Sequence, residues 1–183
     1  MSYPIIAYGA PILRQKALAI EKGTPMQPLV QAMFTTMDRA QGVGLAAPQI
    51  GQSIRLFIVN LAAYLQEKGR GGTGRKVFIN PVLTVDDGIA PSTCQEGCLS
   101  IPSLLIPVPR REKITIHYFN TQWQWQKEVW TGFPARVMQH EYDHLEGKLH
   151  IDYAPPLRKR LLQKPLAKIR QGQVDVPYPM HFA

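Results

Sequence analysis

Cysteine is scarce in this chain, which has only Cys94 and Cys98 among its 183 residues. So low a number argues against a fold held by disulfides and favours free thiols. Long apolar runs are also missing, and no segment reaches the roughly 18 residues that a membrane-spanning helix needs. The first residues lack the basic start and apolar core of a signal peptide. We therefore expect one cytoplasmic domain that covers residues 1–183 and has no contact with membranes.

Acidic residues are absent between Leu157 and Arg170, where six basic residues occur in a chain of net charge +8. Such a basic segment, which starts at about residue 155, predicts either an anionic partner or an ordinary solvated helix face. No aromatic residue lies among these charges, so the base stacking of single-strand nucleic-acid binding is not expected. Pro165 lies inside the segment and predicts an interruption of any helix there.

The pattern of apolar residues predicts strands followed by a central helix. Thr24 and Pro25 have the residue types of a helix start, and apolar residues then recur at helical spacing. A second helix is expected from about Thr131 to Leu145, ended by Gly147. Residues of high β preference form four runs, at Ile54–Val59, Lys76–Val82, Lys113–Phe119 and Trp125–Trp130. This order predicts an α+β fold with antiparallel sheets packed around the central helix.

Two glycine-rich segments lie between these elements. Gly42–Gln49 contains too much glycine and proline for a regular element, so it is expected to be irregular. Gly69–Gly74 formally matches the dinucleotide-binding pattern G-x-G-x-x-G. That motif requires a helix directly after it, whereas a strand is predicted here. We therefore interpret Gly69–Gly74 as a flexible hairpin tip.

The predicted central helix carries the motif H-E-x-x-H at His140, Glu141 and His144. Residues four apart lie on one face of a helix with Cβ atoms roughly 6 Å apart, so both imidazoles can bind one metal ion. Glu141 lies one step around the helix and can reach a water at that metal. Phe133 and Val137 share the same stripe, which places the two histidines on the apolar face of the helix. The motif therefore predicts a metal centre.

Two histidines need a further protein ligand, and the sequence offers two candidates. Downstream, His150 completes the longer pattern H-E-x-x-H-x-x-G-x-x-H of metzincin-like zinc peptidases, with His140 and His144. Upstream, Cys98 offers a thiolate. The absence of a signal and a pro-segment argues against a secreted metzincin. The residues themselves leave both ligand sets open.

A structural zinc site is a further alternative, since Cys94 and Cys98 could join the two histidines in a Cys₂His₂ set. The segment between the pairs, residues 99–139, is much longer than the roughly 12 residues of a zinc finger. A structural site would also fill all four positions and leave none for water. We expect Cys94 to be a small buried side chain on a strand.

Three segments resemble the signature motifs of the peptide deformylases, in the order in which that family has them. They are Gly42–Gln49, Glu96–Ser100 and Gln139–His144. The resemblance extends from Pro11–Arg14 to Tyr153, and no matching motif follows Arg170. It implies that Cys98, His140 and His144 bind one divalent metal ion. The family's native ion is Fe²⁺, with Zn²⁺, Ni²⁺ or Co²⁺ as possible substitutes.

The same resemblance implies a reaction, the hydrolysis of the N-formyl group from the first methionine of new polypeptides. Glu141 would be the general base. The Gln49 side-chain amide and the Leu99 backbone N–H would stabilise the anionic oxygen of the tetrahedral intermediate. Nascent formyl-methionine chains are then the partners, and the basic segment Leu157–Arg170 would dock on the ribosome through its RNA phosphates.

Substrate-binding residues also follow from the resemblance. Val43, Gly44 and Gly97 would pair with the extended peptide backbone as an added strand. Phe133 and Val137 would form part of an apolar pocket for the methionine side chain.

Overall fold

The structure is a computed structural model that describes residues 2–69, 73–86 and 88–182. Its helices are α1 (Gln27–Arg39), α2 (Ala62–Glu67), α3 (Gly132–Leu145) and α4 (Pro156–Arg170), with 3₁₀ turns η1 (Pro11–Arg14), η2 (Ala47–Ile50) and η3 (His150–Tyr153). Its strands are β1 (Ile5–Ile6), β2 (Gly44–Ala46), β3 (Leu56–Asn60), β4 (Arg75–Val85), β5 (Ser92–Cys98), β6 (Ile101–Arg110), β7 (Lys113–Phe119), β8 (Trp125–Thr131) and β9 (Met180–His181).

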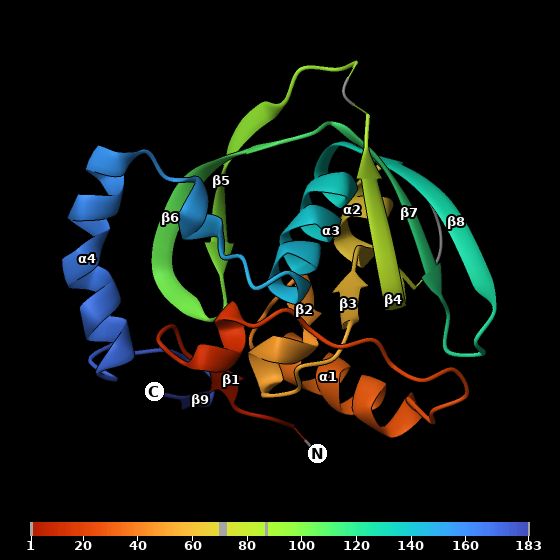
Figure 1. Ribbon diagram of the computed structural model, residues 1–183, viewed down its shortest axis with the longest axis horizontal. Helices are drawn as coiled ribbons and strands as arrows, with labels where there is room; N and C mark the ends of the chain where they lie inside the picture. The colour runs from red at the N-terminus through yellow and green to blue at the C-terminus, as the bar shows by residue number, and fades with distance from the viewer. Residues whose placement is uncertain (1, 70–72, 87, 183) are drawn as a thin grey trace.

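The strands form three sheets around a central helix, which confirms the predicted α+β class. Five antiparallel strands follow the order β2-β3-β4-β7-β8, β5 pairs antiparallel with β6, and β1 pairs parallel with β9. Figure 1 shows α3 between the five-stranded sheet and the long β5–β6 ribbon, with α4 on the far side of that ribbon. None of the described helices is long and apolar enough to cross a bilayer.

Helix α3 is held in place by its apolar face and by the way it ends. Ala135, Met138 and Leu145 are fully buried, and the helix packs against β2 and β3. The chain leaves the helix at Gly147, whose φ of 68° is in the left-handed region that glycine tolerates. A Cβ at Gly147 would also lie 2.5 Å from the Arg14 carbonyl oxygen, so glycine is required there for space as well. The predicted limits of this helix are correct to within one residue.

Several other sequence predictions need correction. Helix α1 begins at Gln27 with Pro28 in its first turn, so Thr24 does not cap it. The Thr24 hydroxyl donates instead to the Glu21 carbonyl at 2.7 Å. The segment Gly42–Gln49 is not irregular, because it contains β2 and most of η2. Helix α4 runs through Pro165 without a break.

The remaining differences concern the strands. Strand β4 extends beyond its predicted end to Val85, with a register irregularity between Ile79 and Val82 that accommodates Pro81. Strand β6 was not predicted, and β5 was predicted only in so far as Cys94 was expected on a strand, because the prolines and small residues of these strands mask the β pattern. The unpredicted helix α2 lies between β3 and the glycine-rich segment, so a simple hairpin between β3 and β4 is wrong. Within that segment, residues 70–72 lie outside the described residues.

Candidate metal centre

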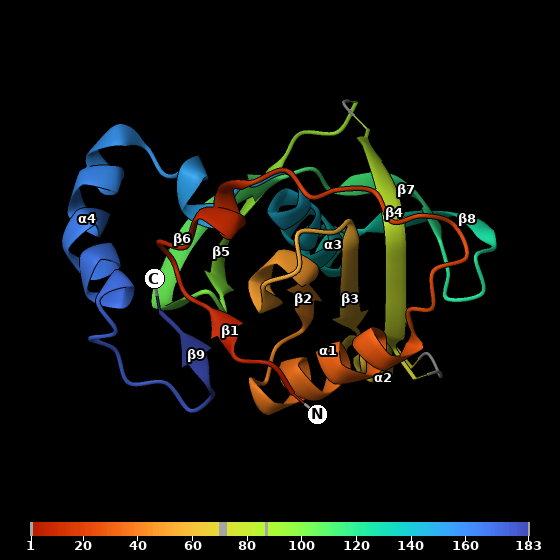
Figure 2. The same ribbon diagram turned by 60° about the horizontal axis from the view of Figure 1, so that its bottom comes forward.

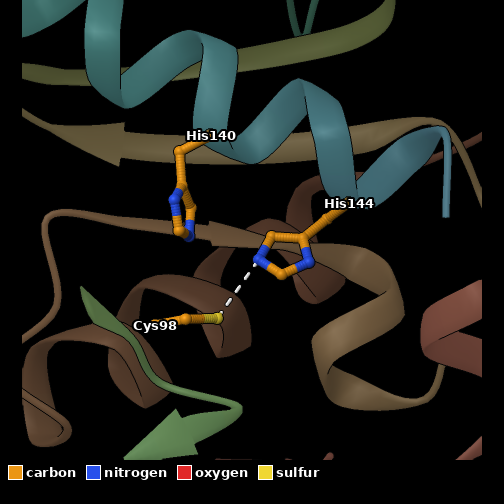
Figure 3. Close-up of side chains that lie close together, drawn as sticks. All are labelled: Cys98, His140 and His144. Atoms are coloured by element: carbon orange, nitrogen blue, oxygen red, sulfur yellow. Dashed lines mark hydrogen bonds between the residues drawn. The ribbon is translucent and has the colours of Figure 1, made fainter. Parts of the chain in front are cut away.

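Three side chains from two elements meet beside α3. Cys98 is the last residue of β5, whereas His140 and His144 project from successive turns of α3. One potential ligand atom from each residue lies within 4.8 Å of the other two. Figure 3 shows both imidazoles turned towards Cys98, with the thiol sulfur 3.4 Å from Nε2 of His144. The predicted ligands are therefore brought together in a group that can hold one metal ion.

The chemistry of this donor set fits a divalent metal. Burial alone would raise the pKa of the Cys98 thiol. His144 and hydrogen bonds from neighbouring imidazoles more than offset burial, and they hold this pKa well below its ordinary value. These contacts favour the thiolate form of Cys98, which is the form that binds metals. One thiolate and two imidazoles suit iron and zinc alike.

A buried carboxylate fixes the orientation of His140. Oε2 of Glu96 lies 3.0 Å from Nδ1 of His140, which leaves Nε2 of the ring free to face the metal position. Arg110 donates two hydrogen bonds of 3.0 Å to Glu96, and Arg136 donates a third of 2.8 Å. Burial alone would raise the pKa of Glu96, but bonds from His140 and Arg110 lower it to about 2. Glu96 therefore stays ionised.

Arg110 links this carboxylate to the rest of the core. Its guanidinium also donates to Asp143 at 2.5 Å and lies 3.3 Å from the Tyr153 hydroxyl, which donates to Asp143 at 2.9 Å. One buried arginine on β6 thereby joins β5, α3 and η3. Neither Glu96 nor Arg110 was predicted from the sequence to have a role at this site. Glu96 could have been found as the acidic residue two positions before Cys98, whereas Arg110 carries no signal in the sequence.

Glu141 is buried beside the group, in contact with the β2 backbone. Burial raises the pKa of Glu141 to about 7. Its Oε2 has no hydrogen-bond partner among the described residues. A Cβ built on Gly44 would lie 2.4 Å from Oε1 of Glu141, so only glycine leaves room for this carboxylate. Glycine is thus required at position 44 to make room for the Glu141 carboxylate, in addition to allowing a peptide to approach.

The side-chain amide of Gln49 is oriented by the backbone. Its Oε1 accepts a 2.9 Å hydrogen bond from the Ala46 N–H. The amide nitrogen therefore faces the opposite way, 3.6 Å from the Cys98 sulfur and 3.3 Å from the Ser100 hydroxyl. Gln49 is buried, and Leu99, which directly follows Cys98, lines the same cavity as Gln49. Two hydrogen-bond donors predicted from the sequence therefore lie close to the metal group.

A cavity of about 480 Å³ opens next to these groups. All five residues predicted to bind substrate line it, namely Val43, Gly44, Gly97, Phe133 and Val137. Among the described strands, β2 ends the five-stranded sheet and β5 pairs only with β6, so each has an edge free for hydrogen bonding. The segment Asp175–Tyr178 also lines the cavity, although the sequence after Arg170 offered no motif to indicate this.

The two competing ligands lie outside the metal group. The Nε2 atom of His150 faces the Leu104 carbonyl oxygen at 3.4 Å, although its ring centroid is only 5.9 Å from that of His140. Cys94 lies on β5 as predicted, but it is exposed rather than buried. Thr93, Cys94 and Gln95 are all exposed, so both faces of β5 are open to solvent at this point.

Comparison with known proteins shows the family of the chain. A model of the polypeptide deformylase family matches residues 2–160. The chain belongs to this family. A peptide deformylase of Cytophaga hutchinsonii is 43% identical over 183 residues, which covers all of this chain and 98% of the relative. A peptide deformylase of Christiangramia forsetii is 42% identical over 190 residues, which covers all of this chain and 96% of the relative.

Solved structures agree with the family assignment. The peptide deformylase of Thermus thermophilus superposes with a TM-score of 0.80 at 40% identity, covering 95% of this chain and all of that one. The peptide deformylase of Thermotoga maritima superposes with a TM-score of 0.75 at 35% identity, covering 85% of this chain and 99% of that one. The chain is accordingly a hydrolase of a metal-dependent family, and it removes the N-formyl group from newly made polypeptides. The metzincin alternative is not supported.

Proposed function

We propose that Cys98, His140 and His144 bind the catalytic metal, and that formyl-methionine peptides are hydrolysed in the adjoining cavity of a cytoplasmic enzyme. One observation carries this proposal. The Cys98 sulfur, two imidazoles, the Glu141 carboxylate and the Gln49 amide lie together beside a cavity at which two strand edges are free for hydrogen bonding. When bound, the metal acts as a Lewis acid that lowers the pKa of a water molecule and polarises the formyl carbonyl. Fe²⁺ is the proposed native ion, and Zn²⁺, Ni²⁺ or Co²⁺ fit the same donors.

Glu141 is proposed to carry the proton during hydrolysis. It directly follows His140, and its Oε2 is buried without a partner among the described residues, so it is free to accept a proton from water. The same oxygen can then deliver this proton to the nitrogen of the departing amine. Contact with Gly44 limits the movement of the carboxylate, which keeps both transfers short.

Gln49 and Leu99 are proposed to stabilise the negative charge that develops on the formyl oxygen. The Ala46 N–H occupies the carbonyl side of the Gln49 amide, so its N–H₂ group is turned towards the metal group before substrate arrives, 3.6 Å from the Cys98 sulfur. The Leu99 backbone N–H would be the second donor. Groups fixed in advance need no reorganisation during the reaction, and losing one typically costs roughly 10²–10³ in rate.

The peptide is proposed to enter as a strand between β2 and β5. Val43 and Gly44 on one side and Gly97 on the other would form backbone hydrogen bonds with it. Backbone pairing suits a substrate class that shares only its first residue, because it does not depend on the following side chains. Phe133 and Val137 would contact the methionine side chain, one and two turns before His140 on α3.

Helix α4 is proposed to bring the enzyme to the ribosome. The helix buries Leu162, Leu166 and Ile169 against the β5–β6 side of the molecule, whereas its six basic residues are exposed. One of them, Arg158, also donates a 3.3 Å hydrogen bond to the Leu105 carbonyl oxygen on β6. The helix lies at the periphery of the molecule, beside the β5–β6 ribbon (Figure 1). Phosphates of ribosomal RNA would bind them with release of counterions.

The ligand assignment is tested by three single substitutions. Cys98→Ala should abolish both metal retention and deformylation, because the thiolate is the only charged donor of the set. His150→Ala should keep metal content near that of the wild type, and Cys94→Ser is the matched control for removal of a thiol. Metal is measured by elemental analysis after anaerobic purification, and activity with a formyl-Met tripeptide. Loss of metal from His150→Ala together with its retention in Cys98→Ala would refute the proposal.

A further inference from the structure

The last described residues, 173–182, form a segment that we call the C-terminal strap. After α4 the strap returns across the molecule to β1, where Met180–His181 pair parallel with Ile5–Ile6. Figure 2 shows β9 beside β1 after this return, close to the C-terminus. The backbone N–H groups of Ile5 and Ala7 donate to Pro179 and His181, at 2.9 and 2.8 Å. Backbone hydrogen bonds to β1 therefore hold the C-terminal end of the strap in place.

The middle of the strap is fixed to the catalytic cavity. The Tyr178 hydroxyl donates a 3.0 Å hydrogen bond to the carbonyl oxygen of Leu99, the residue directly after Cys98. Tyr178 and Met180 pack on the cluster around α1, while Val174 and Phe182 pack on the cluster around α4. The four residues Asp175–Tyr178 line the cavity together with the two strand edges. The strap is thus a wall of the groove.

One charge stands out on this wall. Asp175 is the single exposed ionisable side chain among the described residues that line the cavity. The other charged groups are engaged deeper inside, since Glu96 pairs with Arg136 at 2.8 Å and Glu141 is buried. No described residue forms an ion pair with Asp175. Among the described lining residues, the exposed part of the groove therefore carries one negative charge, although the whole chain has a net charge of +8.

A peptide whose formyl group lies at the metal must leave the cavity past its exposed rim. We propose that the strap contacts the residues after formyl-methionine, and that Asp175 makes the enzyme favour Lys or Arg and disfavour Asp or Glu among them. The inference rests on the proposed function and adds a specificity to it. A carboxylate about 7–8 Å from a substrate charge, partly in water, changes binding about two- to fivefold.

The test uses pentapeptide substrates that begin with formyl-Met. Residues two, three and four are changed one at a time to Lys, Ala or Glu. At one or more of these positions the wild type should prefer Lys over Glu by about tenfold in kcat/KM. The difference should lie mainly in KM, because the rim charge acts on the bound substrate and on the transition state alike. It should shrink in about 0.5 M salt, which screens exposed charges.

Two substitutions assign the preference to the strap. Asp175→Asn should make Lys and Glu peptides equivalent within about twofold, and Asp175→Lys should invert the preference. The control Glu67→Gln removes an exposed acid of α2 that does not line the cavity, and it should keep the wild-type ratio. A wild-type ratio near one at every position, or an unchanged ratio in Asp175→Asn, would overturn the inference. Failure of the metal-loaded wild type to turn over even the Ala peptides would instead refute the proposed function.

Discussion

At the scale of single residues, the site depends on groups whose importance comes from contact with other groups. Glu96 binds His140 and is itself bound by two arginines, so the ring is oriented before a metal arrives. Gly44 matters because of what it lacks, since the Glu141 carboxylate occupies the space of a Cβ. Such contacts join segments far apart in the chain. The spacing of a motif predicts which residues bind a metal, but it does not predict contacts between segments that are distant in the sequence.

Gly44→Ala should therefore displace the proposed general base. The added methyl would lie 2.4 Å from Oε1 of Glu141, so the carboxylate has to move. A displacement of about 1 Å typically costs about 10² in rate, which should appear in kcat. Overpacking should cost stability by about 1–3 kcal/mol, leaving a folded protein. Steady-state kinetics and thermal unfolding measure both effects.

The matched control for this prediction is Gly88→Ala. Gly88 lies outside the cavity, and a Cβ there would meet only the end of the Asp86 side chain at 3.2 Å. This variant should keep wild-type kcat. A Gly44→Ala enzyme with wild-type kcat would show that Glu141 can work from another position, or that it is not the base.

At the scale of elements, the long amphipathic patterns were predictable and the short or proline-rich ones were not. The limits of β7 and α3 follow from β-branched alternation and from Gly147, both of which act locally. Strands β5 and β6 are recognisable only by the partner that each gives the other. Helix α4 contains Pro165, yet burial of Leu162, Leu166 and Ile169 offsets the lost hydrogen bond. For β5, β6 and α4, tertiary contacts outweighed the local preference of the sequence.

Reversal of Arg158, Lys159 and Arg160 to Glu tests the role proposed for α4. All three side chains are exposed, so the fold should persist. Co-sedimentation with ribosomes should fall, and the salt dependence of the remaining binding should flatten, because fewer phosphates are neutralised. Activity on a free formyl-Met tripeptide should not change. Equal co-sedimentation of the two proteins, or none in the wild type, would mark α4 as an ordinary solvated face.

At the scale of the whole molecule, metal binding and folding are linked through the buried ligands. Metal at about 1,000 times its dissociation constant adds roughly 4 kcal/mol to stability, which corresponds to a rise in Tm of about 10 °C. Burial alone would lower the pKa of His140, but Cys98 and Glu96 hold it well above its ordinary value, so a proton competes with the metal. Affinity should thus increase with pH.

Calorimetry of the metal-loaded and metal-free protein checks this linkage. The gap between the two Tm values should narrow as the pH falls from about 8 to 6, because protonated ligands release the metal. Cys94→Ser should show the same gap as the wild type, since this thiol is exposed and outside the metal group. Equal Tm values at pH 8, or a gap that widens in acid, would contradict the linkage.

The pairing of β1 with β9 also sets an order of events during synthesis. Ile5–Ile6 are synthesised before the five-stranded sheet and α3, whereas Met180–His181 are synthesised after both of them. The strand partner of β1, and with it the wall that Tyr178 attaches to Leu99, becomes available only after α4 has been made. The substrate groove is therefore completed later than the metal group, whose three residues all precede α4 in the chain.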